Sequence, residues 1–102
     1  MTKKRWSKLS LAGQIANIGS EISRAEHWEK MRDGRNQERA LERTLELTNL
    51  TIADKRWRRH LKELTRLQEI ICDLIAKTHI YDCSLKDLKY FCLPFALSVR
   101  KF

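Results

Sequence analysis

The chain has 102 residues, of which 42% are hydrophobic and 33% charged; this composition excludes a disordered polymer and suits one folded domain over residues 1–102. Only three glycines and one proline are present, too few for the many turns of a β-sandwich or barrel, so long helices are expected. The net charge of +8 favours a polyanionic partner or an anionic membrane surface. The N-terminal MTKKRWSK lacks the apolar region of a signal peptide, and no apolar run is long enough to span a bilayer, which predicts a cytoplasmic protein that does not use a membrane.

Two helices are expected in the first half of the chain. Apolar residues recur at three- and four-residue steps from about 8 to 32, the period of a helix with one buried face. A second stripe, suited to close core packing or to a subunit contact, consists of Ala12, Ala16, Gly19 and Ser23. Asp33 and Gly34 predict a turn, with Gly34 in the left-handed conformation that closes a helix. The second helix, roughly 36–53, is expected to bury Leu41, Leu45, Thr48 and Ile52, with Leu47 and Leu50 beside them.

Two further helices are expected in the second half. Asp54 is placed to cap a helix over roughly 55–79, which has the strongest apolar period in the chain and includes Trp57 on its inward face. Ser84 and Asp87 approximate a capping box for a last helix over roughly 84–100. Pro94 interrupts that helix, so a kink or an end is expected near Leu93.

Four helices joined by short connections predict an all-α, antiparallel up-down-up-down four-helix bundle. In that topology the starts of the first and third helices share one end with the finish of the second and fourth. This end, which we call the basic pole, collects eleven of the 21 Lys and Arg residues: Lys3, Lys4, Arg5, Lys8, Lys55, Arg56, Arg58, Arg59, Lys62, Arg100 and Lys101. All of them except Lys3 are predicted to bind nucleic acid.

The basic pole favours binding to a phosphate backbone without sequence readout, because arginine forks fit phosphate oxygens and helix starts add positive charge. Arg56, Arg58 and Arg59 are the leading predicted contacts. Trp57 is expected in the core and not as a base-stacking platform. Two alternatives stay open: the charge only keeps the protein soluble, or it binds an acidic protein.

The patterns of enzymes and metal sites are missing from the sequence. Cys72, His79, Asp82 and Cys83 have no familiar zinc spacing, and three cysteines without a CxxC motif indicate reduced thiols. The interval between Arg56 and His60 is shorter than in the HEPN ribonucleases, and there is no phosphate loop, nucleophile elbow or dinucleotide fingerprint. We therefore expect no catalytic residue, no metal and no cofactor.

The last expected helix contains YFCLPFALSV at 90–99, which is apolar on nearly all sides. A single closing helix would leave part of that surface exposed, which predicts an interface with copies of the chain or with a larger protein. The alternative function is accordingly a protein-interaction adaptor, or small regulatory partner, that uses this helix while its charge serves solubility.

Three stretches, IANIGSEISRA (15–25), ALERTLELTNLTIAD (40–54) and RLQEIICD (66–73), resemble a group of small bacterial proteins. With the length, charge and expected bundle, the chain resembles the four-helix family of ribosomal intervening-sequence proteins and of the accessory variability determinant (Avd) of diversity-generating retroelements. The resemblance implies a non-enzymatic homo-oligomer, pentameric in that family, that binds a reverse transcriptase and its template RNA. It favours RNA over DNA as the ligand of the basic pole.

Overall fold

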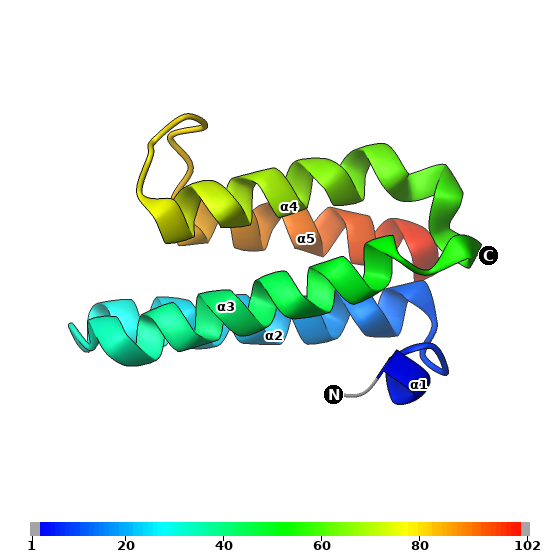
Figure 1. Cartoon of the computed structure of the whole chain (residues 1–102), viewed down its shortest axis with the longest axis horizontal. Coiled ribbons are helices and arrows are strands. Elements are labelled where there is room, and N and C mark those ends of the chain that lie inside the picture. Colours follow the sequence, from blue (N-terminus) through cyan, green and yellow to red (C-terminus); the bar gives the residue numbers. More distant parts are fainter. Residues whose placement is uncertain (1–2, 101–102) are drawn as a thin grey trace.

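The computed structural model describes the backbone of residues 3–100 and the side chains of residues 3–92. This part of the chain is helical and contains no β-strand. Its elements are α1 (Lys3–Trp6), α2 (Leu11–Lys30), α3 (Gly34–Ile52), the 3-10 helix η1 (Lys55–His60), α4 (Leu61–Ala76) and α5 (Leu85–Arg100), shown in Figure 1. None of the described helices is both long and apolar enough to cross a lipid bilayer.

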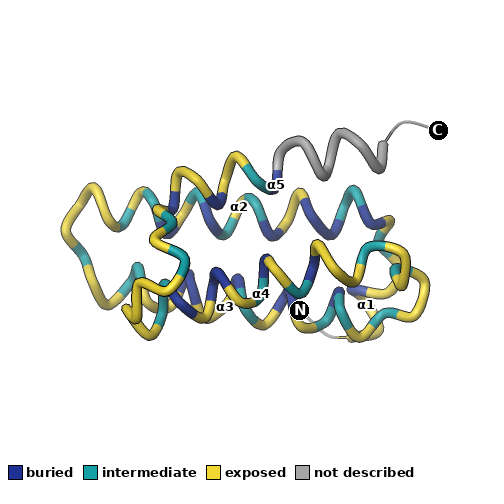
Figure 2. The backbone as a smooth tube through the Cα atoms, turned by 90° about the horizontal axis from the view of Figure 1, so that it is seen from above, coloured by how far each residue is buried: buried dark blue, intermediate teal, exposed yellow. Residues whose placement is uncertain are grey.

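The four long helices lie side by side along the long axis of the molecule (Figure 1). Helix α2 packs against α3 and α5, and α3 also packs against α4. Figure 2 shows α2 and α5 as one layer and α3 and α4 as the other, with buried residues facing the space between them. Within the described part, the backbones of α4 and α5 approach each other less than those of the three pairs above.

The core is built mainly from the predicted apolar faces of α2 and α4. Its most buried members include Ile15, Ile18 and Ile22 of α2. Leu64, Leu67 and Ile71 of α4 and Leu85 and Leu88 of α5 also belong to it, and α3 adds Leu41 and Leu47. The three- and four-residue apolar period in these helices therefore predicts their buried faces correctly.

Helix α3 buries Leu41 and Thr48 as predicted, and it also buries Thr44 and Thr51, which the apolar pattern does not include. Thr44, Thr48 and Thr51 are fully buried, and each hydroxyl donates to the carbonyl four residues earlier at 2.7 to 3.0 Å. Because those bonds satisfy the hydroxyls inside the helix, threonine fills core positions without an orphan polar group. The predicted Leu45 and Ile52 are only half-buried.

The small-residue stripe of α2 is only partly buried. Ala16 is exposed, and a Cβ atom built on Gly19 meets no atom within 4 Å. Ala12, Gly19 and Ser23 are half-buried, so the stripe lies at the edge of the core and outside its fully buried part.

The first predicted helix, 8–32, is interrupted near its start. Residues 7–10 separate α1 from α2, and the Ser10 Oγ accepts from the Gly13 amide at 3.1 Å to cap α2. The turn at its other end also differs, since Arg32, with φ 57°, adopts the left-handed conformation predicted for Gly34. Gly34 begins α3 instead, and the Asp33 carboxylate caps this helix by accepting from the Asn36 amide at 3.1 Å.

The third predicted helix, 55–79, is two elements. Residues 55–60 form η1, where Trp57 has non-helical angles of φ −104° and ψ 23°, and α4 ends at Ala76. The predicted Asp54 cap is confirmed, because its carboxylate accepts from the Arg56 amide at 3.1 Å. This cap starts a tight 3-10 turn and not a regular α-helix.

Two carboxylates of α4, Asp73 and Glu69, hold the connection between α4 and α5, and Glu69 accepts from the Tyr81 hydroxyl. Asp73, a buried residue of α4, accepts from the Thr78 hydroxyl, the Ile80 amide at 2.9 Å and the Tyr81 amide at 3.1 Å. The Thr78 hydrogen bond is the main reason that the pKa of Asp73 lies below its ordinary value, and the two amides lower it further. Asp73 therefore shapes the 77–84 loop from inside α4.

Helix α5 confirms the predicted cap at its start and continues through Pro94. Ser84 and Asp87 make the reciprocal bonds of a capping box. The Ser84 amide donates to the Asp87 carboxylate at 3.0 Å, and the Asp87 amide donates to the Ser84 hydroxyl at 3.1 Å. The helix then continues past Pro94 to Arg100, which agrees with the predicted range of roughly 84–100; of the two outcomes expected at Pro94, a kink or an end, the end does not occur. One missing backbone donor does not end a helix whose preceding turns are fastened by a cap and by buried leucines.

Lys77→Gly is expected to stabilise the protein by about 1 kcal/mol, because Lys77 closes α4 in the left-handed conformation that penalises a Cβ atom. Its φ is 57°. Urea unfolding followed by circular dichroism measures the change. Arg43→Gly in the middle of α3 is the control and should destabilise by about 1 kcal/mol. Destabilisation by Lys77→Gly would contradict the left-handed cap.

The cysteines are expected to differ sharply in reactivity. Burial raises the pKa of the Cys92 thiol to about 12, so it stays protonated, whereas Cys72 is exposed on α4. Under native conditions, Ellman's reagent should modify Cys72 quickly and Cys92 only after denaturation. Mass spectrometry of a Cys83→Ser variant separates the two sites, and rapid native labelling of Cys92 would contradict its packing against the core.

Candidate nucleic-acid interface

Two basic segments far apart in the sequence meet at one end of the molecule. One is residues 3–8, comprising α1 and the start of the turn after it, and the other is η1 with the start of α4. The Trp6 indole N–H donates to the Thr51 hydroxyl at 2.9 Å, which fastens α1 to the end of α3. Arg56 donates to the Leu9 carbonyl at 3.1 Å, which joins η1 to the turn before α2. Figure 1 shows α1 and the α3–α4 junction at the same end.

Gln14 links the two segments from inside the molecule. Its side chain is fully buried; its amide Nε2 donates to the Trp6 carbonyl at 2.9 Å, and its Oε1 accepts from the Trp57 indole N–H at 3.1 Å. Each polar atom of the amide thus holds one segment, and we call this pair of bonds the Gln14 bridge. A buried amide satisfied on both sides positions its partners firmly, because losing either bond would leave a polar atom without water.

Arg56 has a structural role as well as a charge. Its guanidinium contacts the Asp54 carboxylate at 2.6 to 3.1 Å, and its central carbon lies 4.4 Å from the centroid of the Trp57 ring. The side-chain hydrogen bond from Arg56 is the largest cause of the lowered pKa of Asp54, and the same bond raises the pKa of Arg56. With the bond to Leu9, these contacts tie Arg56 into the turn that it stabilises.

The remaining described cations of the basic pole point into solvent. Arg5 is exposed, and so are the seven side chains for which the described part shows no ion pair: Lys3, Lys4, Lys8, Lys55, Arg58, Arg59 and Lys62. The acid at the centre of this end, Asp54, is already paired with Arg56. The side chain of Arg100 and the whole of Lys101 lie outside the described residues. The local field at this end is therefore strongly positive.

Trp57, which is predicted to lie in the core, is less buried than Trp6, for which the sequence gives no placement. Trp6 is 1% exposed and belongs to the core, whereas Trp57 is only half-buried and packs against the core from its edge. Periodicity misses Trp6 because α1 is four residues long, too short to show a period. The one signal in the sequence is a large apolar side chain among five charged or polar neighbours, a pattern consistent with an anchoring residue.

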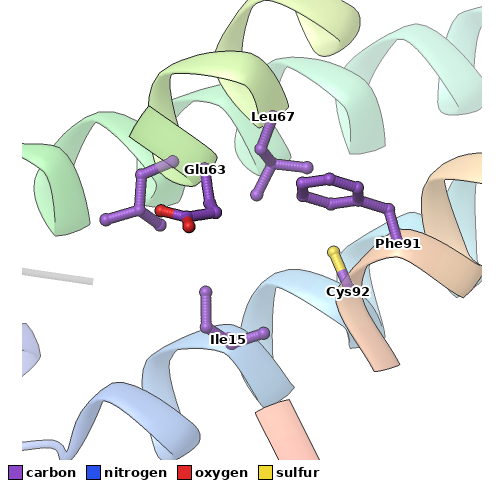
Figure 3. Close-up of a pocket in the computed structure, with 6 residues that line it drawn as sticks. Ile15, Glu63, Leu67, Phe91 and Cys92 are labelled. Atoms are coloured by element: carbon purple, nitrogen blue, oxygen red, sulfur yellow. The ribbon is translucent and has the colours of Figure 1, made fainter. Parts of the chain in front are cut away.

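An apolar crevice lies between α2, α4 and α5, and Figure 3 shows its lining. Its walls are Ile15, Leu64, Leu67, Phe91 and Cys92, with the Glu63 carboxylate beside them. It has no room for a water molecule. Such a crevice is a seam between packed helices and holds no substrate.

Within residues 3–92, no three His, Cys, Asp or Glu side chains gather in a way that could hold a metal ion. On α5, Tyr90 is 59% exposed and Phe91 is half-buried. Cys92 of the same segment is buried. The side chains from residue 93 onward lie outside the described part.

Comparison with known proteins finds no matching family model, no matching curated protein and no matching solved structure.

Proposed function

We propose that the protein is a non-enzymatic RNA-binding accessory protein whose basic pole contacts the phosphate backbone. The observation that carries this proposal is the meeting of residues 3–8 with η1 and the start of α4, which concentrates exposed Lys and Arg at one end. A surface that served solubility alone would gain nothing from this concentration, since like charges held close together repel.

In this proposal the exposed arginines and lysines contact phosphate in different ways. Arg58 and Arg59 bind phosphate oxygens in the bidentate geometry of the guanidinium, and Lys55 and Lys62 act as point charges beside them. The first turns of α2 and α4 add partial positive charge. Arg56 supports the turn through Asp54 and Leu9 and contributes its charge from there.

The proposed architecture is an up-down-up-down antiparallel bundle, which is supported by the packing of α2 on α3 and α3 on α4 with short connections. The proposed biological setting follows the family resemblance: a cytoplasmic homo-oligomer, pentameric if the resemblance holds, that helps a reverse transcriptase of a diversity-generating retroelement use its template RNA. The exposed Tyr90 of α5 marks the surface that we assign to protein contacts.

Salt dependence tests the proposal directly. Labelled structured RNA is titrated with the protein at several salt concentrations, and the logarithm of the affinity should fall against the logarithm of salt with a slope of roughly −3 to −5, as expected for about five phosphate contacts. Absence of binding at low salt would overturn the proposal. It would favour the protein-interaction adaptor, for which the exposed Tyr90 on α5 is the specific observation.

A further inference from the structure

The aromatic rings of the basic pole are already engaged. Trp6 is 1% exposed and hydrogen-bonded to Thr51. Trp57 packs against the core, donates its indole N–H to Gln14 and carries the Arg56 guanidinium over its ring at 4.4 Å. His60 is half-buried and has its own contacts. Neither tryptophan at this end therefore presents an open ring face to a nucleobase.

This absence bears on the kind of nucleic acid that the pole can recognise. Proteins that bind single strands stack unpaired bases on exposed aromatic side chains, and each stacked base contributes about 1 to 3 kcal/mol. Double-stranded RNA keeps its bases inside and is recognised by its shape, its phosphates and its 2′-hydroxyl groups. Cations without an available stacking platform suit the second kind of ligand.

The Gln14 bridge adds a geometric argument. It holds the segment of residues 3–8 at a constant separation from η1, through bonds of 2.9 and 3.1 Å to Trp6 and Trp57. Two rigidly spaced rows of cations can contact the two backbones that flank one groove, a spacing that a duplex maintains and a flexible strand does not. Preorganised contacts of this kind avoid the ordering cost that a flexible partner would add.

We infer that the basic pole binds the paired backbones of a nucleic-acid duplex, in preference to a single strand, and that Gln14 is the residue that positions the two rows of cations for it. This inference rests on the proposed function, which it narrows to helical regions of RNA. A DNA duplex shares the paired phosphate backbones but has a different groove spacing, so it is the second ligand in the test.

The test compares ligands with equal numbers of phosphates. Fluorescence anisotropy measures the affinities for an RNA duplex of about 20 base pairs, an unstructured RNA strand of about 40 nucleotides and a DNA duplex of the same sequence. The expected result is at least about tenfold tighter binding of the RNA duplex than of the strand, with a steeper salt dependence. Equal binding of the DNA duplex would assign recognition to paired backbones in general, and weaker binding would assign it to the A-form spacing.

Gln14→Met tests the positioning role, because it fills the same space without either hydrogen bond. Its duplex affinity should fall towards that of the strand, while its strand affinity stays within about threefold of the original, since scattered charges still attract a flexible chain. Trp57→Phe is the second variant, which removes the N–H donated to Gln14 and part of the ring beneath Arg56. Circular dichroism and a melting curve establish that each variant is folded.

The outcomes separate the inference from the proposed function. If neither duplex nor strand binds, the proposed function fails. If the strand binds as tightly as the duplex, or if tryptophan emission is quenched by the strand in the original protein, the inference fails while RNA binding stands. If both folded variants keep the original ratio of duplex affinity to strand affinity, Gln14 does not position the two rows of cations.

Discussion

The Arg58→Glu/Arg59→Glu double variant is expected to lose at least about 100-fold of its RNA affinity, the loss of two charge-assisted phosphate contacts of about 1.5 kcal/mol each. Both side chains are exposed on η1. The salt slope should also become shallower by about 2, because two fewer cations displace counterions from the RNA. Anisotropy titrations at several salt concentrations measure both quantities.

Arg56 is left unchanged in that variant for a structural reason. Its reversal would break the pair with Asp54, the bond to the Leu9 carbonyl and the contact over Trp57, so lost binding could reflect a collapsed turn. Arg58 and Arg59 carry no ion pair in the described part of the molecule and report on charge alone.

Arg35→Glu/Arg39→Glu is the matched control. It makes the same change in net charge on exposed side chains of the first turns of α3, at the other end of the molecule (Figure 1). Its affinity should fall by less than about fivefold, since charges separated by more than a Debye length are largely screened. An equal loss in the control would assign binding to net charge and would contradict a localised pole.

Trp6→Ala is expected to cost about 3 to 5 kcal/mol of folding free energy, the usual effect of removing a buried tryptophan. Trp6 is 1% exposed and is the only core residue of α1, so its loss both opens a cavity and releases the basic segment 3–8. Against the total stability of a domain this size, about 5 to 15 kcal/mol, the variant should be close to unfolding on mild heating. Urea unfolding followed by circular dichroism measures the loss.

Trp6→Phe is the control for the anchor. The phenyl ring keeps most of the packing but removes the donor to Thr51, so the expected cost is about 1 to 2 kcal/mol. Thermal melting of the three proteins should rank the original above Trp6→Phe and Trp6→Ala below both. A Trp6→Ala variant within about 0.5 kcal/mol of the original would show that α1 is not anchored as described.

The sequence predicts the long helices and their caps because both depend on neighbours within one or two turns. The apolar period of residues 61–76 marks the buried face of α4, and the Asp54 cap and the Ser84–Asp87 box appear where short-range patterns place them. The start of α2 is less predictable, since Ser10 follows an apolar residue that continues the same period. With Asp33 as its N-cap, α3 begins at Gly34, so Gly34 is not available to close α2. The left-handed conformation falls on Arg32 instead.

The sequence by itself determined the helical class, most of the apolar faces and the concentration of positive charge in residues 3–8 and 55–62, because periodicity, capping and composition are local properties. Only the tertiary structure decided that Trp6 is core, that Arg56 is tied to Asp54 and Leu9, and that Gln14 joins the two basic segments. Trp6 meets Thr51 across 45 positions and Trp57 meets Gln14 across 43. No local pattern encodes such pairs, since the bonds form only when the packed helices bring buried donors and acceptors together away from water.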